Sequence, residues 1–292
     1  MTIVSVGCFV PAAPWKARLT AVVSKAVLAV HEDGAAISIV SLLSSMDSRA
    51  FCITDGFQAF CKTAIGTLHA HGPTADLTYD GSSLRLIDDD SVLFDSNTAF
   101  WDPRSLLGAA AASIAPHDDL AIRALCELIE LGIGALYDKG RQAEGIHGED
   151  TFGSAFRRLC LDPDFLLKLV GFGPGSTPAG DDFLAGFLAG RDLLEGGPGL
   201  AQAALRTALR TRLVRTTPAG RALLLGALDG VPPAYLVDLM LAAAAWLAER
   251  HVQAESRLLG AVEEAMRHGA TSGEDALTGF IYALGRSLMI GQ

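Results

Sequence analysis

Cysteine is scarce in this sequence of 292 residues, and its few copies are not arranged in pairs. The count of five is odd, and no two cysteines form a C-x-x-C motif. A disulfide framework and a cysteine-based zinc site are therefore disfavoured. The N-terminal segment does not resemble a signal peptide, because it has no charged side chain before its apolar residues and contains Pro11 and Pro14. These absences predict a cytoplasmic protein with reduced thiols.

Long apolar runs and an excess of positive charge are missing too. A membrane-spanning helix needs about 20 apolar residues, whereas Leu239 to Ala248 offers only ten uncharged positions between Asp238 and Glu249. We expect a buried helix there and no membrane association. Lys and Arg number 23 against 33 Asp and Glu, for a net charge of -10. Because no global positive potential attracts phosphates, we expect no nucleic-acid partner.

Several well-known catalytic motifs are absent as well. The sequence contains no Ser-His-Asp nucleophile elbow, no H-E-x-x-H zinc motif and no Walker A loop. What it does have is a large hydrophobic fraction, 50%, against 19% charged residues. A chain of this length buries roughly 75% of its unfolded surface. The composition therefore predicts a folded protein of one or two domains.

The first hundred residues carry the pattern of short strands. Strands are predicted at residues 37–41, 50–54, 76–79, 83–87 and 92–94. Three Asp-Gly dipeptides punctuate this region and supply the positive φ values of tight hairpin turns. One helix is predicted over residues 15–30, because apolar residues from Trp15 to Val30 recur at spacings of three and four.

From Pro103 onward the composition shifts to Ala, Leu and Gly with helical periodicity. Helices are predicted at residues 104–115, 118–137, 151–169, 181–194, 200–215, 219–228, 233–249, 252–267 and 274–290. The predicted fold class is α+β. A small β-rich N-terminal domain with one helix, residues 1–102, is followed by a larger all-helical domain, residues 103–292.

A helix start recurs within the helical half. Residues 177–190 read TPAGDDFLAGFLAG, residues 217–230 read TPAGRALLLGALDG, and a looser third copy at residues 271–279 reads TSGEDALTG. Thr is a good N-cap, and Pro suits the first helical position. Glycine inside a helix costs about 1 kcal/mol relative to Ala, so its recurrence predicts that these helices pack closely together.

A glycine-rich loop precedes the first copy and reads GFGPGSTPAG over residues 171–180. Such a loop at a helix start exposes backbone N–H groups and the positive end of the helix dipole, which together favour an anion. Asp181 and Asp182 follow at once. Since carboxylates repel an anion, they require a cation or N–H donors on the same ligand.

The aligned copies extend this site. The positions of Asp181 and Asp182 are taken by Arg221 and Ala222 in the second copy and by Glu274 and Asp275 in the third. We predict that the three helix starts converge on a ligand. The predicted catalytic residues are Asp181, Asp182, Asp275 and Arg221. The predicted substrate-binding residues are Gly173, Gly175, Ser176, Thr177, Gly180, Thr217, Thr271, Ser272 and Glu274. The alternative for any single acid is stabilisation of a helix dipole.

Charge distribution supports a positive patch beside the second copy. Between Glu195 and Asp229 the chain has no acidic residue. Five arginines lie in this segment, at positions 206, 210, 212, 215 and 221. Guanidinium groups bind carboxylate and phosphate bidentately, although a solvated or subunit-contacting face is an equal alternative. His147 and His268 are weaker candidates, because a lone loop histidine is usually only solvated.

Two segments resemble a known family. They are GFGPGSTPAGDDFLAG at residues 171–186 and GATSGEDALTG at residues 269–279. They are similar to the AllH-type subunit of oxamate carbamoyltransferase, in which Leu and Ser are usual where this chain has Ser176 and Ala179. The resemblance covers about residues 165–290. It implies a small anionic substrate, partner enzyme subunits, and the interconversion of oxalurate plus phosphate with oxamate plus carbamoyl phosphate in allantoin breakdown.

Two other functions remain open from the residues alone. One is a non-catalytic scaffold or regulatory subunit that senses an anionic metabolite. The other is a metal-assisted hydrolase with Asp181, Asp182 and Asp275 as magnesium ligands, because hard oxygen donors suit that ion. No cofactor is firmly predicted, and Mg²⁺ is the one candidate.

Overall fold

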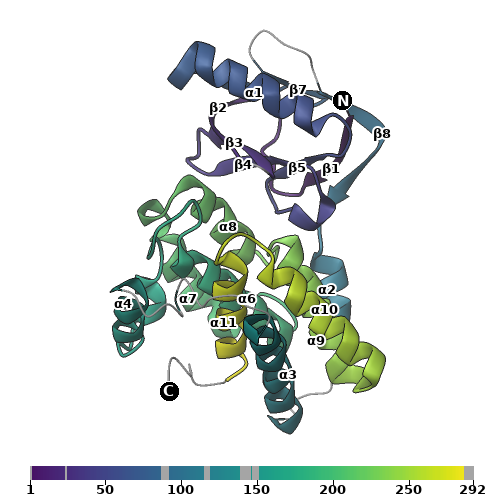
Figure 1. The fold of residues 1–292 in the computed structure, drawn as a ribbon, viewed down its shortest axis with the longest axis vertical. Coiled ribbons are helices and arrows are strands. Elements are labelled where there is room, and N and C mark those ends of the chain that lie inside the picture. Colours follow the sequence, from purple (N-terminus) through teal and green to yellow (C-terminus); the bar gives the residue numbers. More distant parts are fainter. Residues whose placement is uncertain are drawn as a thin grey trace. The chain divides into compact units, whose positions relative to one another are not determined.

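The computed structural model describes residues 2–23, 25–86, 92–114, 119–138, 146 and 151–285. The chain divides into two compact units, Met1–Asp102 and Pro103–Gln292. The described elements of the first unit are mainly strands and those of the second are helices (Figure 1), so the predicted α+β class is confirmed. Among the described helices, none combines the length and the hydropathy that a membrane crossing requires.

The described strands of the first unit close into a barrel in the order β1-β5-β4-β3-β2-β6-β7-β8. They span Thr2–Gly7 (β1), Trp15–Val22 (β2), Ala26–His31 (β3), Ala36–Val40 (β4), Ala50–Ile53 (β5), Asp76–Tyr79 (β6), Ser83–Leu86 (β7) and Val92–Trp101 (β8). β1 pairs in parallel with β8, β4 pairs in parallel with β5, and the other neighbours are antiparallel. Gly34 and Gly81 take φ values of 79° and 97° in the β3–β4 and β6–β7 hairpins, as the Asp-Gly dipeptides predict.

The helix predicted over residues 15–30 is wrong, because this segment forms β2 and β3. Trp15, Ala17 and Leu19 are buried, while the residues between them, Lys16 and Arg18, are exposed. This alternation has a period of two and is typical of a strand with one buried face. The spacing of three and four arose from combining residues of two separate strands.

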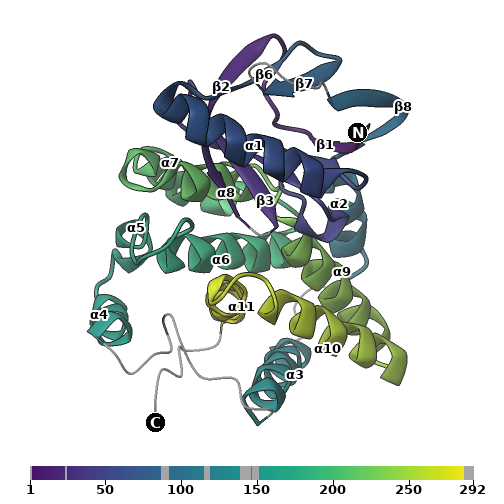
Figure 2. The ribbon, with the colours of Figure 1, turned by 45° about the horizontal axis from the view of Figure 1, so that its top comes forward.

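A helix that the sequence analysis missed spans Phe57–His71 (α1). Phe57, Phe60, Cys61 and Ala64 have helical spacing and join the buried core of the barrel. Figures 1 and 2 show α1 lying along the barrel. The remaining Asp-Gly dipeptide, Asp55-Gly56, directly precedes this helix. Its glycine is the N-cap of α1 and forms a strand-to-helix turn instead of a hairpin. Two short 3-10 helices, Leu43–Ser45 (η1) and Gly72–Thr74 (η2), also lie in this unit.

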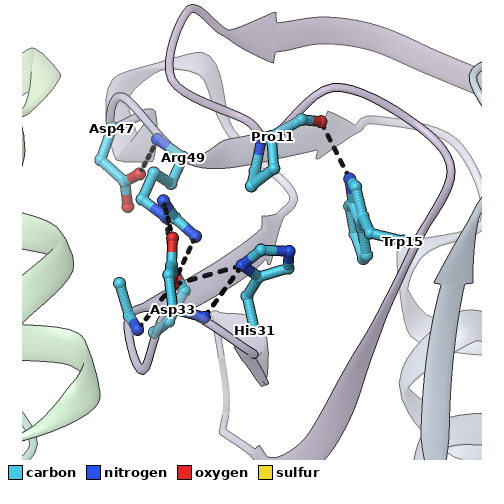
Figure 3. Close-up of polar contacts among 8 residues, drawn as sticks. Pro11, Trp15, His31, Asp33, Asp47 and Arg49 are labelled. Carbon is cyan, nitrogen blue, oxygen red and sulfur yellow. Dashed lines mark hydrogen bonds and ion pairs between the residues drawn. The ribbon is translucent and has the colours of Figure 1, made fainter.

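A buried arginine fixes the β3–β4 turn to the start of β5 (Figure 3). Arg49 lies 2.8 Å from a carboxylate oxygen of Asp33, and its Nε donates to the carbonyl of Ala36 at 3.1 Å. The backbone N–H of Arg49 donates to Asp47 at 2.7 Å. The nearby Trp15 donates its indole N–H to the carbonyl of Pro11 at 3.0 Å. These contacts satisfy the polar groups that the fold buries in this part of the unit.

The second unit is built from helices on both sides of a central pair, α6 and α11. The described helices are Arg104–Ala112 (α2), Asp119–Asp138 (α3), Thr151–Leu159 (α4), Phe165–Lys168 (α5), Ala179–Glu195 (α6), Ala203–Arg210 (α7), Pro218–Leu228 (α8), Ala234–Glu249 (α9), Val252–Met266 (α10) and Ser272–Ala283 (α11), with 3-10 turns at Leu200–Gln202 (η4) and Leu213–Arg215 (η5). The segment predicted as one helix over residues 151–169 is divided into α4 and α5. Pro163 lies between them and cannot continue a helix, since it lacks an N–H group.

Candidate functional site

Helices α6 and α11 pack backbone against backbone, and Figure 2 shows α11 nearly end-on against the length of α6. A Cβ atom at Gly186 would overlap the carbonyl oxygen of Ala276, and one at Gly190 would lie 2.8 Å from the Cβ of Ala283. The prediction that the repeat's glycines mark close packing is confirmed for these residues. Their partner is the helix of the third copy.

The hydroxyl groups that precede the three helices join their starts. Oγ1 of Thr177 lies 3.2 Å from Oγ of Ser272, which links the first copy to the third. The hydroxyl of Thr217 donates to the carbonyl of Ser176, which links the second copy to the loop before the first. The N-terminal ends of α6, α8 and α11 therefore meet in one place.

The three threonines do not have the same capping role. Thr217 is the N-cap of α8, and its hydroxyl accepts from the N–H of Gly220 at 2.9 Å, as expected. Pro178 is the N-cap of α6, so the prediction that Thr177 caps this helix is wrong. Pro178 has an extended ψ of 142°, and the chain becomes helical one residue later. Thr271 is the N-cap of α11, but its side chain makes no capping hydrogen bond.

Asp181 is buried and has both carboxylate oxygens occupied. One oxygen accepts from the N–H of Gly171 at 2.8 Å, and the other accepts from the hydroxyl of Thr216. Burial raises its pKa to about 6, although both hydrogen bonds act in the opposite direction. Asp181 thus ties the glycine-rich loop to the segment before α8, and this geometry suits a positioning role.

Asp182 and Asp275 each keep one carboxylate oxygen, Oδ2, that is buried and makes no hydrogen bond in the described part of the chain. Their side chains are 2% and 0% exposed. Oδ1 of Asp275 accepts from the N–H of Ile146 at 3.1 Å. Burial raises the pKa of Asp275 to about 7. Burial, together with the charge of Asp275, raises the pKa of Asp182 well above its usual range, against the opposing effect of the Ser272 and Thr177 hydroxyls.

Glu274 completes the acidic group that the third copy was predicted to supply. It is 1% exposed, and the hydroxyl of Tyr137 in α3 donates to its Oε1. Four carboxyl groups from α6 and α11 are therefore buried at the helix starts, as their first-turn positions suggested.

Tyr235 is a neighbour of the acids that the sequence analysis missed. It lies in the first turn of α9 and is 3% exposed. Burial raises the pKa of its phenol, and the negative charges of Asp182 and Asp275 raise it further. Its ring stacks on that of His268, with centroids 4.2 Å apart and planes at 22°. No sequence feature marked this tyrosine, because it follows two prolines in an apolar helix.

The glycine-rich loop has the backbone that its composition predicts. Gly171, Gly173 and Gly175 have φ values of 73°, 113° and 103°, in the region that glycine adopts without strain. A Cβ atom at Gly180 would overlap the carbonyl oxygen of Leu169, so the loop packs tightly against the chain that enters it.

The first N–H groups of α6 are already used within this loop. Gly180 donates to the carbonyl of Phe172 at 2.8 Å, and Asp181 and Asp182 both donate to that of Pro178, at 2.8 and 3.2 Å. These donors do not face an incoming anion. For Gly173, Gly175 and Ser176, substrate binding stays a prediction.

Arg221 lies in the first turn of α8 and is partly buried. Its Nε atom is buried and makes no hydrogen bond in the described part of the chain. Two arginines of the predicted positive patch have structural partners instead. Arg206 pairs with Asp192 and donates to backbone carbonyls at the end of α8, and Arg210 pairs with Asp229.

A metal site receives no support from the described residues. Within them, no group of three or more His, Cys, Asp or Glu side chains is arranged to hold a metal ion. The magnesium site considered for Asp181, Asp182 and Asp275 stays a prediction. His147 lies outside the described residues.

Fold and site together define a protein of two units, whose helical unit buries a carboxyl cluster where three helix starts meet. The family model described as oxamate carbamoyltransferase subunit AllH matches residues 169–284. The resemblance carried by the two sequence motifs is thus confirmed over the segment that builds the cluster from α6, α8 and α11. Neither a curated protein nor a solved structure matches the chain.

Proposed function

We propose that this chain is a subunit of a carbamoyltransferase that moves a carbamoyl group between phosphate and oxamate, and that substrate binds at the converged helix starts. The observation that carries the proposal is that the family match and the cluster of helix starts occupy the same stretch of the chain. The match to the AllH family runs from residue 169 to residue 284. The helix starts and buried acids, from Gly171 to Asp275, lie within that stretch.

The reaction requires a proton as well as a carbamoyl group to move. A phosphate oxygen attacks the ureido carbon of oxalurate, the bond from that carbon to the amide nitrogen breaks, and the nitrogen leaves as the –NH₂ of oxamate. The proton that phosphate gives up must reach this nitrogen. A carboxyl group that gains and loses a proton near neutral pH suits such a transfer, and Asp275, whose pKa burial raises to about 7, is the candidate.

The anionic part of the substrate requires a positive group, and Arg221 is the candidate. It lies in the first turn of α8, whose N-cap, Thr217, donates a hydrogen bond to the glycine-rich loop. A guanidinium group binds a carboxylate or phosphate with two parallel hydrogen bonds. Positioning and fixed donors of this kind account for much of the rate in group transfer, at several kcal/mol for each well-placed donor.

The test is phosphate release from carbamoyl phosphate, measured on the complex isolated through a tag on the full chain. We expect release to depend on oxamate and to be lost in Asp182→Asn. Asp164→Asn is the matched control, because Asp164 is exposed and belongs to none of the three converged helix starts. Absence of oxamate-dependent release contradicts the proposal. Full release by Asp182→Asn would favour a scaffold or sensing role.

A further inference from the structure

We infer that Asp182 and Asp275 form a recognition site for the primary amide group, –CO–NH₂, of the ligand, and that the pair excludes a carboxylate in the same place. This inference rests on the proposed function for the choice of oxamate as probe. It goes further by assigning one end of the ligand to one pair of side chains.

The first observation is the unused hydrogen-bonding capacity of the pair. Each side chain is almost fully buried, and each has one oxygen without a partner in the described part of the chain. A buried polar atom that lacks a hydrogen bond costs about 1–3 kcal/mol. Such atoms in a folded protein require an explanation, and two of them on neighbouring acids indicate a missing ligand.

The second observation is the charge around the pair. No described ion pair links a cation to either acid, whereas each acid lies close enough to affect the same phenol on Tyr235. When two carboxyl groups lie close together in a buried place, they do not both remain charged. A shared proton leaves one group as an acceptor and the other as a donor.

The chemistry of the ligand follows from that pattern. An amide presents an N–H donor and a carbonyl acceptor on adjacent atoms, which complements one carboxylate and one protonated carboxyl group. A carboxylate in the same position would bring only acceptors and a further negative charge. Within the described residues, no group of three acidic, cysteine or histidine side chains is arranged to hold a metal ion, and Mg²⁺ binding is one of the outcomes of the test below.

The glycine-rich loop places the pair close to the surface. Ser176 is exposed, Thr177 is partly buried, and the hydroxyl of Thr177 contacts Ser272, which lies three residues before Asp275. These hydroxyls lower the pKa of Asp182, but burial and the charge of Asp275 raise it by more, so Asp182 is the member that holds the proton. The two acids therefore lie in the first turns of helices that begin next to an exposed segment of the loop.

The test compares oxamate with oxalate, which differ only in the exchange of an amide for a carboxylate. Calorimetric titration of the full chain at neutral pH should show oxamate binding at least about 100-fold more tightly, because a site built to pair with N–H groups rejects an analogue that lacks them. Asp275→Asn should remove most of that preference, since an amide side chain offers a donor where the ligand needs an acceptor. Asp182→Asn keeps a donor in place of the protonated carboxyl group and should retain most of it. Asp164→Asn should keep it.

Each other outcome bears on the inference. Equal affinity for the two anions, binding of neither, or a preference unchanged in Asp275→Asn would overturn it. Binding of Mg²⁺ alone that disappears in the Asn variants would also overturn it and give the pair to a metal. Thermal melting of the variants checks that they fold. The titration needs no turnover, so it separates the two proposals. A preference for oxamate without carbamoyl transfer would contradict the proposed function alone, and carbamoyl transfer without the preference would contradict this inference alone.

Discussion

In α6, Gly186 lies against the backbone carbonyl group of Ala276 in α11, where any side chain would overlap that oxygen. Gly279 of α11 makes the reciprocal contact with the carbonyl group of Phe183 in α6. Backbone atoms of both helices therefore touch, and no flexible side chain lies between them to absorb a change. This contact sets the distance between the two helix starts and hence between Asp182 and Asp275.

Replacement of Gly186 by Ala should destabilise the protein by at least about 2 kcal/mol, since overpacking against a rigid backbone forces the helices apart. Gly260→Ala is the matched control. Gly260 is exposed in α10, and a Cβ atom there meets nothing within 4 Å. This variant should gain about 0.5–1 kcal/mol from the better helix propensity of Ala. Urea denaturation measures both free energies, and equal effects of the two substitutions would contradict the proposed contact.

The sequence predicted the helical unit well because its periodic segments are long. Where the prediction of the first unit failed, the segments were short. Over residues 15–30, apolar residues of two different strands happen to follow one another at helical spacing. Only the alternation of apolar and polar residues from Trp15 to Leu19 identifies β2 as a strand. In α1, apolar residues such as Phe57 and Phe60 have helical spacing, but the Asp-Gly dipeptide before them is also typical of a hairpin turn.

The convergence of the helix starts could be predicted because the motif occurs three times. The hydrogen bonds at those starts could not, because they depend on how the loop closes. Pro178 replaced Thr177 as the N-cap of α6, and the first N–H groups of that helix turned back to the loop. Tyr235 reaches the acids only through the packing of α9, which no local pattern encodes.

The stability of the unliganded protein should depend on pH through the buried acids. The folded pKa values of Asp181, about 6, and Asp275, about 7, lie above the ordinary value of 3.8. The folded state therefore holds protons that the unfolded chain has released. Their stabilising contribution is fully present below about pH 4 and is lost as the pH rises through 6 and 7.

Asp275→Asn isolates this effect from the titration of other groups. The amide never charges, so the variant avoids the cost of a buried carboxylate. Its melting temperature should exceed that of the wild type at pH 8, and the difference should shrink toward pH 5. Melting curves across this range measure it, and a difference that does not change with pH would refute the raised pKa of Asp275.

Arg206 should matter to stability far more than Arg210, although both form ion pairs. Arg206 and Asp192 are 8% and 4% exposed at their side chains, whereas Arg210 and Asp229 are 39% and 41% exposed. Removing one partner of a buried pair leaves an uncompensated charge and costs about 3–5 kcal/mol. An exposed pair contributes about 0–1 kcal/mol. Urea denaturation of Arg206→Ala and Arg210→Ala measures the contrast, and similar losses would show that the first pair is not buried in solution.

Tyr235→Phe should weaken ligand binding with little effect on folding. The phenylalanine keeps the ring that stacks on His268 and removes only the hydroxyl, which lies within electrostatic reach of Asp182 and Asp275. Because burial keeps this phenol neutral, it is an O–H donor beside the two acids at any physiological pH. We expect this hydroxyl to donate a hydrogen bond to a charged group in the oxamate-bound site. Loss of such a bond costs about 1.5–3 kcal/mol, so oxamate affinity should fall at least about tenfold.

Tyr282→Phe is the control for this last substitution. Tyr282 packs its ring against Phe165, Phe183 and Phe187, and burial followed by the charge of Cys160 raises the pKa of its phenol. Neither Asp182 nor Asp275 contributes to that shift. Calorimetric titration with oxamate should therefore give wild-type affinity for Tyr282→Phe. If the two tyrosine variants lose affinity equally, the loss comes from general packing, and Tyr235 has no special relation to the acid pair.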